Sequence, residues 1–296
     1  MILAPSKNNS LAEKIRYDIN SCYACGSCLS ECPVNRAVDG LHPRTMVRLV
    51  AFGLMDELVH SPEIWYCISC KRCERACPMS VKPAGLIAAI RQEAYNSHVL
   101  SPQGERRLRS VYSQLHRVRR QVLDLCFDDK PIPDLASEWH RLAHAPLEGK
   151  FDRQPVLTAP SSSVRRASRN YLGFPTNVDF CFTCAECSNA CPVACDRAVF
   201  DPMWINRMAA YGFFEEILRS PSIWLCIKCQ SCTSACTQQV KGHLVISKLQ
   251  EMAIKEGFID PALKSRWSEM EKLVYMQFLK EIDAVRKEAV PLQPAL

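Results

Sequence analysis

Sixteen of the 18 cysteines in this chain fall into four runs that share one spacing, Cys-x2-Cys-x2-Cys-x3-Cys. The runs are Cys22, Cys25, Cys28 and Cys32; Cys67, Cys70, Cys73 and Cys77; Cys181, Cys184, Cys187 and Cys191; and Cys226, Cys229, Cys232 and Cys236. A cysteine content of about 6% without a secretory pattern at the start argues against a disulfide framework, because cytosolic thiols stay reduced. Metal binding is therefore the expected chemistry.

The spacing suits one kind of metal centre. Three thiolates at i, i+3 and i+6 on a tight loop can bind three corners of an iron–sulfur cube, and the fourth, on the chain leaving the loop, can reach a neighbouring cube. Such runs work in pairs, so four runs predict four [4Fe–4S] clusters. Zinc is the alternative, but zinc sites typically join two cysteine pairs and would leave the third cysteine of each run without a role.

The chain repeats itself at an offset of 159 residues, the separation of Cys22 from Cys181, without a gap. The offset also pairs residues that are not cysteines: Pro33 with Pro192, Pro43 with Pro202, Arg48 with Arg207, Gly53 with Gly212, Ser61-Pro62 with Ser220-Pro221, Ile64-Trp65 with Ile223-Trp224, and Val81-Lys82 with Val240-Lys241. We interpret the chain as a tandem duplication. The expected divisions are a first repeat over 10–98, a basic connector over 99–169, a second repeat over 170–257, and a C-terminal helix and tail over 258–296.

Helices are expected to carry the cysteine loops. Ser10 and Glu13 form a capping box for a helix ending near Asp18. Pro43 fits the first turn of a helix that ends or bends near Gly53. The buried face of that helix is expected to contain Met46, Val47, Val50 and Leu54. A short helix reaching His60, stopped by Ser61-Pro62, and a last helix from Pro83 to Asn96 complete the repeat. No alternation of period two predicts strands, so the fold class is all-α.

The connector holds most of the formal positive charge, with 13 Lys/Arg against eight Asp/Glu in residues 101–170. Residues 105–125 predict a basic amphipathic helix. Its apolar side is formed by Leu108, Val111, Leu115, Val118 and Val122. This helix either packs on a repeat with a solvated basic face or docks an acidic partner. Residues 158–170 predict a flexible joint. Near the C-terminus, apolar residues at helical spacing predict a helix packed on the second repeat or on a partner: Trp267, Met270, Leu273, Val274 and Phe278.

Two runs about 45 residues apart, separated by the phrase GLMDELVHSPEIWYCISC at 53–70, resemble the α-helical ferredoxin domain, most closely the C subunit of heterodisulfide reductase. The phrase AYGFFEEILRSPSIWLCIKC at 210–229 repeats the likeness. The cysteine pattern alone also suits iron–sulfur domains of succinate dehydrogenase and glycerol-3-phosphate dehydrogenase assemblies. The resemblance implies an electron-relay subunit, and two such domains in one chain depart from the single domain usual in that family.

The resemblance also implies a ligand set for each cluster, in which the two loops of a repeat exchange fourth ligands. The implied sets are Cys22, Cys25, Cys28 and Cys77; Cys67, Cys70, Cys73 and Cys32; Cys181, Cys184, Cys187 and Cys236; and Cys226, Cys229, Cys232 and Cys191. Such an exchange clamps the two loops together. Cluster binding is therefore expected to supply much of the folding free energy.

Five further residues are open to interpretation. Thr237 replaces the proline that follows the other fourth cysteines, and either tunes a cluster by a hydrogen bond or is neutral. Trp65 and Trp224 either shield a cluster or pack in the core. Cys195 is a spare ligand or an unligated thiol, and Cys126 is predicted to be a buried helix residue.

Several motifs are missing from the sequence. It has no Gly-x-Gly for a dinucleotide, no Cys-x-x-Cys-His for a haem and no Cys-Cys-Gly of the catalytic heterodisulfide reductase subunit. A non-catalytic electron-transfer subunit of an oxidoreductase complex is therefore expected. Sixteen thiolates and four cluster cores of charge 2+ would bring the formal +6 to about −2, so no nucleic-acid partner is expected.

The expected partners are a flavoprotein resembling the A subunit and a catalytic protein resembling the B subunit of heterodisulfide reductase, in anaerobic metabolism. The alternatives are an iron–sulfur subunit of a quinone-linked or acyl-CoA-reducing complex, and a structural or redox-sensing cluster scaffold. No apolar run approaches the roughly 18–20 residues of a membrane span, so a cytoplasmic location is expected, with any membrane association peripheral and made through a complex.

Overall fold

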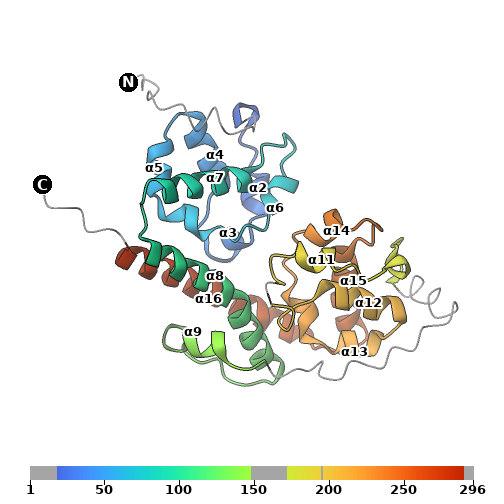
Figure 1. The fold of residues 1–296 in the computed structure, drawn as a ribbon. Helices are drawn as coiled ribbons and strands as arrows, with labels where there is room; N and C mark the ends of the chain where they lie inside the picture. Colours follow the sequence, from blue (N-terminus) through green and yellow to red (C-terminus); the bar gives the residue numbers. More distant parts are fainter. Residues whose placement is uncertain (1–18, 148–171, 195, 290–296) are drawn as a thin grey trace, which may run out of the picture. The chain divides into compact units, whose positions relative to one another are not determined.

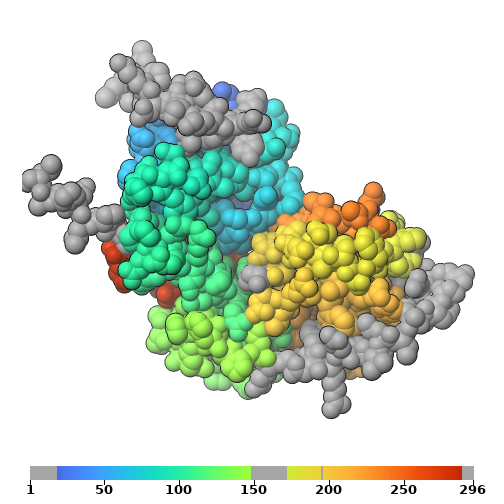
Figure 2. Space-filling view, in the orientation of Figure 1, coloured from blue at the N-terminus to red at the C-terminus, as the bar shows by residue number. Residues whose placement is uncertain are grey.

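The computed structural model describes residues 19–147, 172–194 and 196–289. These residues form helices joined by loops, with no strand among them, as the predicted all-α class requires. They divide into two compact units (Figure 1). The first unit contains the described residues up to Tyr112 and from Tyr275 onward, and the second runs from Ser113 to Val274. Side chains fill the spaces between the ribbons of each unit (Figure 2).

In the first unit, short helices alternate with the cysteine loops. They are η1 (Ile19–Ser21), α2 (Ser27–Ser30), α3 (Pro33–Val38), α4 (Pro43–Ala51), α5 (Met55–His60), η2 (Pro62–Tyr66), α6 (Arg72–Arg75) and α7 (Pro83–Asn96). The predicted helices at Pro43, before Ser61 and from Pro83 to Asn96 are confirmed. Met46, Val47 and Val50 are buried as expected. Leu54 lies outside α4, because Gly53 adopts a left-handed φ of 75° and ends that helix.

The second unit has helices at nearly the same positions after the 159-residue offset. They are η3 (Val178–Phe180), α11 (Glu186–Asn189), α12 (Pro202–Tyr211), α13 (Phe214–Leu218), η4 (Pro221–Leu225), α14 (Ser231–Ala235) and α15 (Gly242–Lys255). Helix α3 has no counterpart among the described residues that follow Cys191. Asp201 caps α12 by accepting from the backbone N–H groups of Met203 and Trp204, at 2.9 and 3.2 Å.

The Ser-Pro-x-Ile-Trp phrase forms a capped 3-10 turn in each unit. Ser61 Oγ accepts from the Glu63 N–H at 3.2 Å, and Ser220 Oγ accepts from the Ser222 N–H at 3.1 Å. A long polar side chain then satisfies the carbonyl of the isoleucine. Arg91 of α7 donates to the Ile64 carbonyl at 2.6 Å, and Gln250 of α15 donates to the Ile223 carbonyl at 2.7 Å. The cysteine loop that follows is thereby tied to the last helix of the repeat.

The remaining helices are α8 (Pro102–Phe127), α9 (Leu135–His144) and α16 (Pro261–Ala289). The predicted apolar side of the connector helix is confirmed, since all five of its residues are buried: Leu108, Val111, Leu115, Val118 and Val122. The boundary between the two compact units falls inside α8 and inside α16. The predicted divisions into two repeats, a connector and a C-terminal tail stay predictions. Helix α9, capped by Asp134, went unpredicted, although Leu135, Trp139 and Leu142 have helical spacing.

Two expectations about the C-terminal helix need correction. Leu273 is 43% exposed and does not belong to the packed face, whereas Trp267, Val274 and Phe278 do. The helix also packs on the second unit only up to Val274. From Tyr275 onward it belongs to the first unit, where Phe278 meets the Tyr112 ring edge-on with ring centroids 5.7 Å apart. The predicted helix over 10–18 and the predicted joint over 158–170 lie outside the described residues.

Candidate metal centres

All four cysteine loops have the same backbone conformation around their second cysteine. The residue before that cysteine and the residue after it both have positive φ. The eight residues are Ala24 and Gly26, Ser69 and Lys71, Thr183 and Ala185, and Lys228 and Gln230, with φ between 55° and 86°. Seven of these are not glycine, and a left-handed φ costs such residues about 1 kcal/mol or more. The third cysteine then lies in a one-turn helix: α2, α6, α11 or α14.

In the first unit, this loop conformation brings Cys22, Cys25 and Cys28 together around one cavity. The fourth cysteine at that cavity is Cys77, which comes from the other loop. We call these four the first outer site. Cys25 is exposed, and beside it Tyr23 and Met79 are 61% and 44% exposed.

The four other cysteines of the first unit are buried together. Burial and, to a smaller extent, the charge of the nearby Cys67 raise the pKa of Cys32 to about 11. Burial also raises the pKa of Cys73, and the charges of Cys67, Cys70 and Cys32 raise it to a smaller extent. These mutual effects place Cys32 with the second loop, and we call the four the first inner site.

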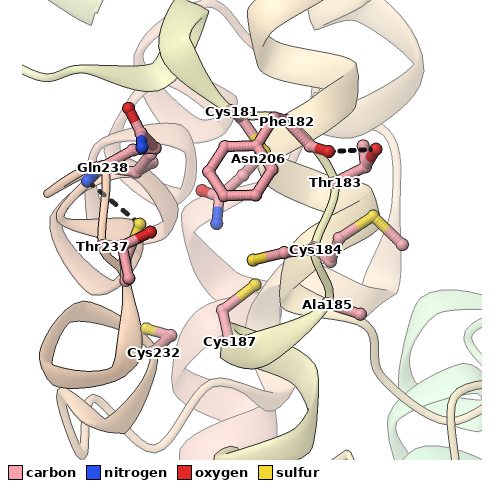
Figure 3. Close-up of a pocket in the computed structure, with 14 residues that line it drawn as sticks. Cys181, Phe182, Thr183, Cys184, Ala185, Cys187, Asn206, Cys232, Thr237 and Gln238 are labelled. Atoms are coloured by element: carbon pink, nitrogen blue, oxygen red, sulfur yellow. Dashed lines mark hydrogen bonds between the residues drawn. The ribbon is translucent and has the colours of Figure 1, made fainter.

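The second unit repeats both groupings. The second outer site surrounds a cavity lined by Cys181, Cys184, Cys187 and Cys236, with Cys232 at its edge (Figure 3). The second inner site surrounds a cavity lined by Cys191, Cys226, Cys229 and Cys232. Cys184 is exposed, whereas Cys229 and Cys232 are buried. Each unit therefore has a more exposed outer site and a more deeply buried inner site.

The chain offers hydrogen bonds to several of these sulfurs. The backbone N–H groups of Ser69 and Lys228 each lie 3.4 Å from the first sulfur of their loop. The N–H groups of Val81 and Val240 lie 3.4 and 3.5 Å from Cys77 Sγ and Cys236 Sγ. Donors to thiolate sulfur stabilise the charged form and tune a cluster held there.

Without metal, burial favours the protonated form of three cysteine thiols at these sites, Cys28, Cys187 and Cys226. Burial raises the pKa of Cys28 to about 11 and that of Cys187 to about 12, with added repulsion from neighbouring cysteines. Burial also raises the pKa of Cys226 to about 12. A thiol must lose its proton to bind metal, so loading each site releases protons.

The donor sets fit iron–sulfur clusters. Sulfur-only sets favour zinc or iron–sulfur centres over the oxygen-preferring magnesium and calcium ions, and a [4Fe–4S] cluster needs four thiolates. Within the described ranges, no group of three His, Cys, Asp or Glu side chains is placed to hold a single metal ion. The structure groups the cysteines in the same sets that the resemblance implies, and their ligation of clusters stays a prediction.

The residues that the sequence left open to interpretation divide as follows. Trp65 and Trp224 are buried core residues, 0% and 7% exposed, and cluster shielding by them is untested. Thr237 lines the second outer cavity. Cys126 is buried in α8, as predicted, at 2% exposed. Cys195 lies outside the described residues.

Sequence reasoning overlooked three polar side chains that line the cavities. Arg44 lines the first outer cavity, Asn206 the second outer cavity, and His243 the second inner cavity. They could have been found by comparing matched positions of the two repeats. The 159-residue offset pairs Arg44 with Met203, Asn206 with Val47, and His243 with Ala84, so each polar residue matches an apolar one.

Comparison with known proteins agrees with these sites. The family described as "4Fe-4S dicluster domain" matches residues 21–82, and the family described as "4Fe-4S binding domain" matches residues 225–239. The first match contains both cysteine runs of the first unit, and the second contains the fourth run. The chain is therefore an iron–sulfur protein of the 4Fe-4S type.

Three curated proteins are similar to parts of this chain. A protein of Archaeoglobus profundus, described as like the C subunit of heterodisulfide reductase, is 32% identical over 107 residues, 36% of this chain and 55% of that protein. The C subunit of the "H(2):CoB-CoM heterodisulfide,ferredoxin reductase" of Methanothermobacter thermautotrophicus is 34% identical over 89 residues, 30% of this chain and 48% of that protein. One iron–sulfur C subunit of the CoB–CoM heterodisulfide reductase of Methanocaldococcus jannaschii is 38% identical over 84 residues, 28% of this chain and 44% of that protein.

The chain thus spans about half the length of the curated relatives it matches. It resembles the C subunit of heterodisulfide reductase and matches a 4Fe-4S dicluster domain over residues 21–82. No solved structure matches the chain. None of the helices in the described part of the chain is long and apolar enough to cross a membrane.

Proposed function

We propose that this chain is a non-catalytic electron-transfer subunit with two tandem α-helical ferredoxin domains and four [4Fe–4S] clusters, one at each outer and inner site. The proposal is carried by one observation: in both units, three cysteines of one loop share a site with the fourth cysteine of the other loop. When bound, the clusters supply one-electron redox chemistry. With all four ligands from the protein, no iron keeps an open position for a substrate.

The chain's own residues give the two sites of each unit different tasks. The outer sites carry an exposed cysteine, Cys25 or Cys184, so they are the points where electrons enter and leave. The exposed aromatic rings of Tyr23 and Phe182, at matched positions, form the apolar rim that a redox partner covers. The buried inner sites pass electrons within the unit and keep water from the sulfurs.

The partners we propose are a flavoprotein like the A subunit and a catalytic protein like the B subunit of heterodisulfide reductase, in a cytoplasmic complex. Support comes from the relatives, which are named as C subunits of reductases that act on the CoB–CoM heterodisulfide. A quinone-linked or acyl-CoA-reducing complex is the second candidate for the same relay. The two are separated by the proteins that co-purify with the chain under anaerobic conditions.

The test of the relay is metal analysis and redox titration of the full chain, purified without oxygen. Four clusters require about 16 irons per chain, and a relay requires their reversible reduction. Zinc in place of iron, or about eight irons, would refute the proposal. Clusters that cannot be reduced would favour a structural scaffold. Selective loss of one cluster in oxygen, with altered partner binding, would favour a redox sensor.

The exchange of fourth ligands is tested by Cys32→Ser. This variant is expected to lose the cluster of the first inner site, which the Cys67 loop holds, and to keep that of the first outer site. The measured iron should fall by about four atoms per chain. Cys126→Ser is the matched control, since Cys126 is a buried cysteine of α8 outside all four sites. If Cys32→Ser instead removed the outer cluster, the fourth ligand would belong to its own loop.

A further inference from the structure

The two outer sites are built from matched positions but differ in the polar groups they contain. Position by position, Val47 and Pro83 of the first cavity correspond to Asn206 and Gly242 of the second. Arg44 of the first cavity corresponds to Met203 of the second. The first cavity therefore has a guanidinium where the second has a thioether, and the second has an amide where the first has an isopropyl group.

Asn206 is unusual for a buried side chain. It lies on α12, is 2% exposed, and its Oδ1 has no hydrogen-bond partner among the described residues. This oxygen can only accept, so a sulfur gives it no partner, and the group of this amide that can bond to sulfur is the Nδ2 donor. The side chain lies at the cavity, with its amide nitrogen directed into the space between Cys184, Cys187 and Thr237 (Figure 3).

Gly242 makes room for this amide. A Cβ at residue 242 would lie 2.8 Å from Asn206 Nδ2 and 3.3 Å from Cys232 Sγ. The first distance is shorter than real Cβ contacts allow, so a residue with a side chain would push the amide away. The matched Pro83 has a Cβ at this place, and Val47 of α4, which is matched to Asn206, lines the same cavity. Asparagine and glycine thus occur as a pair in one unit, and valine and proline as a pair in the other.

We propose that Asn206 donates an N–H hydrogen bond to sulfur at the second outer site and thereby raises the reduction potential of the cluster there, whereas Arg44 supplies the polarising group at the first outer site. The inference rests on the proposed function, since it needs a cluster at each site. Reduction adds negative charge, which a donor aimed at sulfur stabilises. The Arg44 guanidinium lies against Gly26, with Nη1 3.6 Å from the position of a Cβ there.

The two units supply their own exchange variants. Asn206→Val installs the residue of the first unit in the second, and Arg44→Met installs the residue of the second unit in the first. The readout is an anaerobic potentiometric titration of the full chain, followed by electron paramagnetic resonance, with iron counted in every sample. Asn206→Val should lower the reduction potential of one cluster signal by about 59 mV, which is a tenfold change in the equilibrium constant of a one-electron couple. Arg44→Met should lower the reduction potential of a different cluster signal.

Two further variants keep the test decisive. Asn206→Asp retains the shape and removes the donor, so it should shift the same component in the same direction if Asn206→Val loads poorly. Gly242→Ala should do likewise by displacing the amide. Unchanged reduction potentials at full iron content would overturn the inference and leave the proposed relay intact. The same holds if Asn206→Val and Arg44→Met shift the same cluster signal. A wild-type chain without iron would instead refute the proposed function itself.

Discussion

Arg119 of α8 is 0% exposed, and it pairs with Glu271 of α16 within the second unit. It also donates to the Leu225 carbonyl at 3.2 Å and lies 5.9 Å from the centre of the Trp267 ring. Leu225 directly precedes Cys226, so this buried cation connects two long helices with the start of a cysteine loop. Helix α8 therefore uses part of its basic charge for packing.

The two partners of this ion pair predict unequal losses. The Glu271 side chain is 29% exposed, so after Arg119→Met its carboxylate can be solvated, and the loss is that of charged hydrogen bonds, about 2 kcal/mol. The Arg119 side chain is 1% exposed, so Glu271→Ala removes the carboxylate that faces a buried cation, at about 3–5 kcal/mol. The free energy of unfolding of the double variant should be close to that of Arg119→Met alone, because the buried cation is absent from both.

The assay is equilibrium unfolding in urea of the iron-loaded chain, followed by far-ultraviolet circular dichroism. A loss of about 2 kcal/mol moves the midpoint by about 1 M, and Glu271→Ala should move it further. Arg109→Ala on the same helix is the control. Its side chain is 73% exposed and paired with Glu105, so about 0.3–0.5 kcal/mol is expected. Equal losses in both single variants, or losses as small as in the control, would refute the reasoning.

Two further predictions concern the second unit. Burial, with a smaller effect of Arg119, holds the pKa of His116 well below its usual range, so this imidazole is neutral when folded. Its contribution to stability is complete above the unfolded pKa near 6.5 and falls with pH below it, by up to about 1.4 kcal/mol per pH unit. His116→Gln should remove that part of the slope between pH 6.5 and 5, and an unchanged difference between variant and wild type would contradict it. Asp201→Ala should cost about 1 kcal/mol in urea unfolding, because two N–H groups at the start of α12 lose their cap, and an unchanged midpoint would show that the cap is unimportant.

The fold could be predicted from the sequence where local chemistry decides it. Proline fixes φ and has no N–H to lose, so Pro43 and Pro83 mark helix starts that the structure confirms. Gly53 ends α4 because its φ is left-handed. The apolar side of α8 followed from periodicity alone. The spacing of the cysteines likewise predicted iron–sulfur chemistry, which the family matches support.

Tertiary structure decided what depends on contacts between distant residues. Whether Leu273 packs or faces solvent depends on where α16 meets its neighbours, and helical spacing alone placed it on the wrong side. The basic residues of α8 could not be sorted from sequence, because Arg109 is solvated and Arg119 finds its partner 152 residues away. Asn206 of α12 is buried next to Gly242 of α15 and lines the same cavity as the cysteines of the second outer site. Only the folded chain brings these residues together. Spacing along a chain determines local geometry and ligand type, whereas burial and charge pairing depend on the folded neighbourhood.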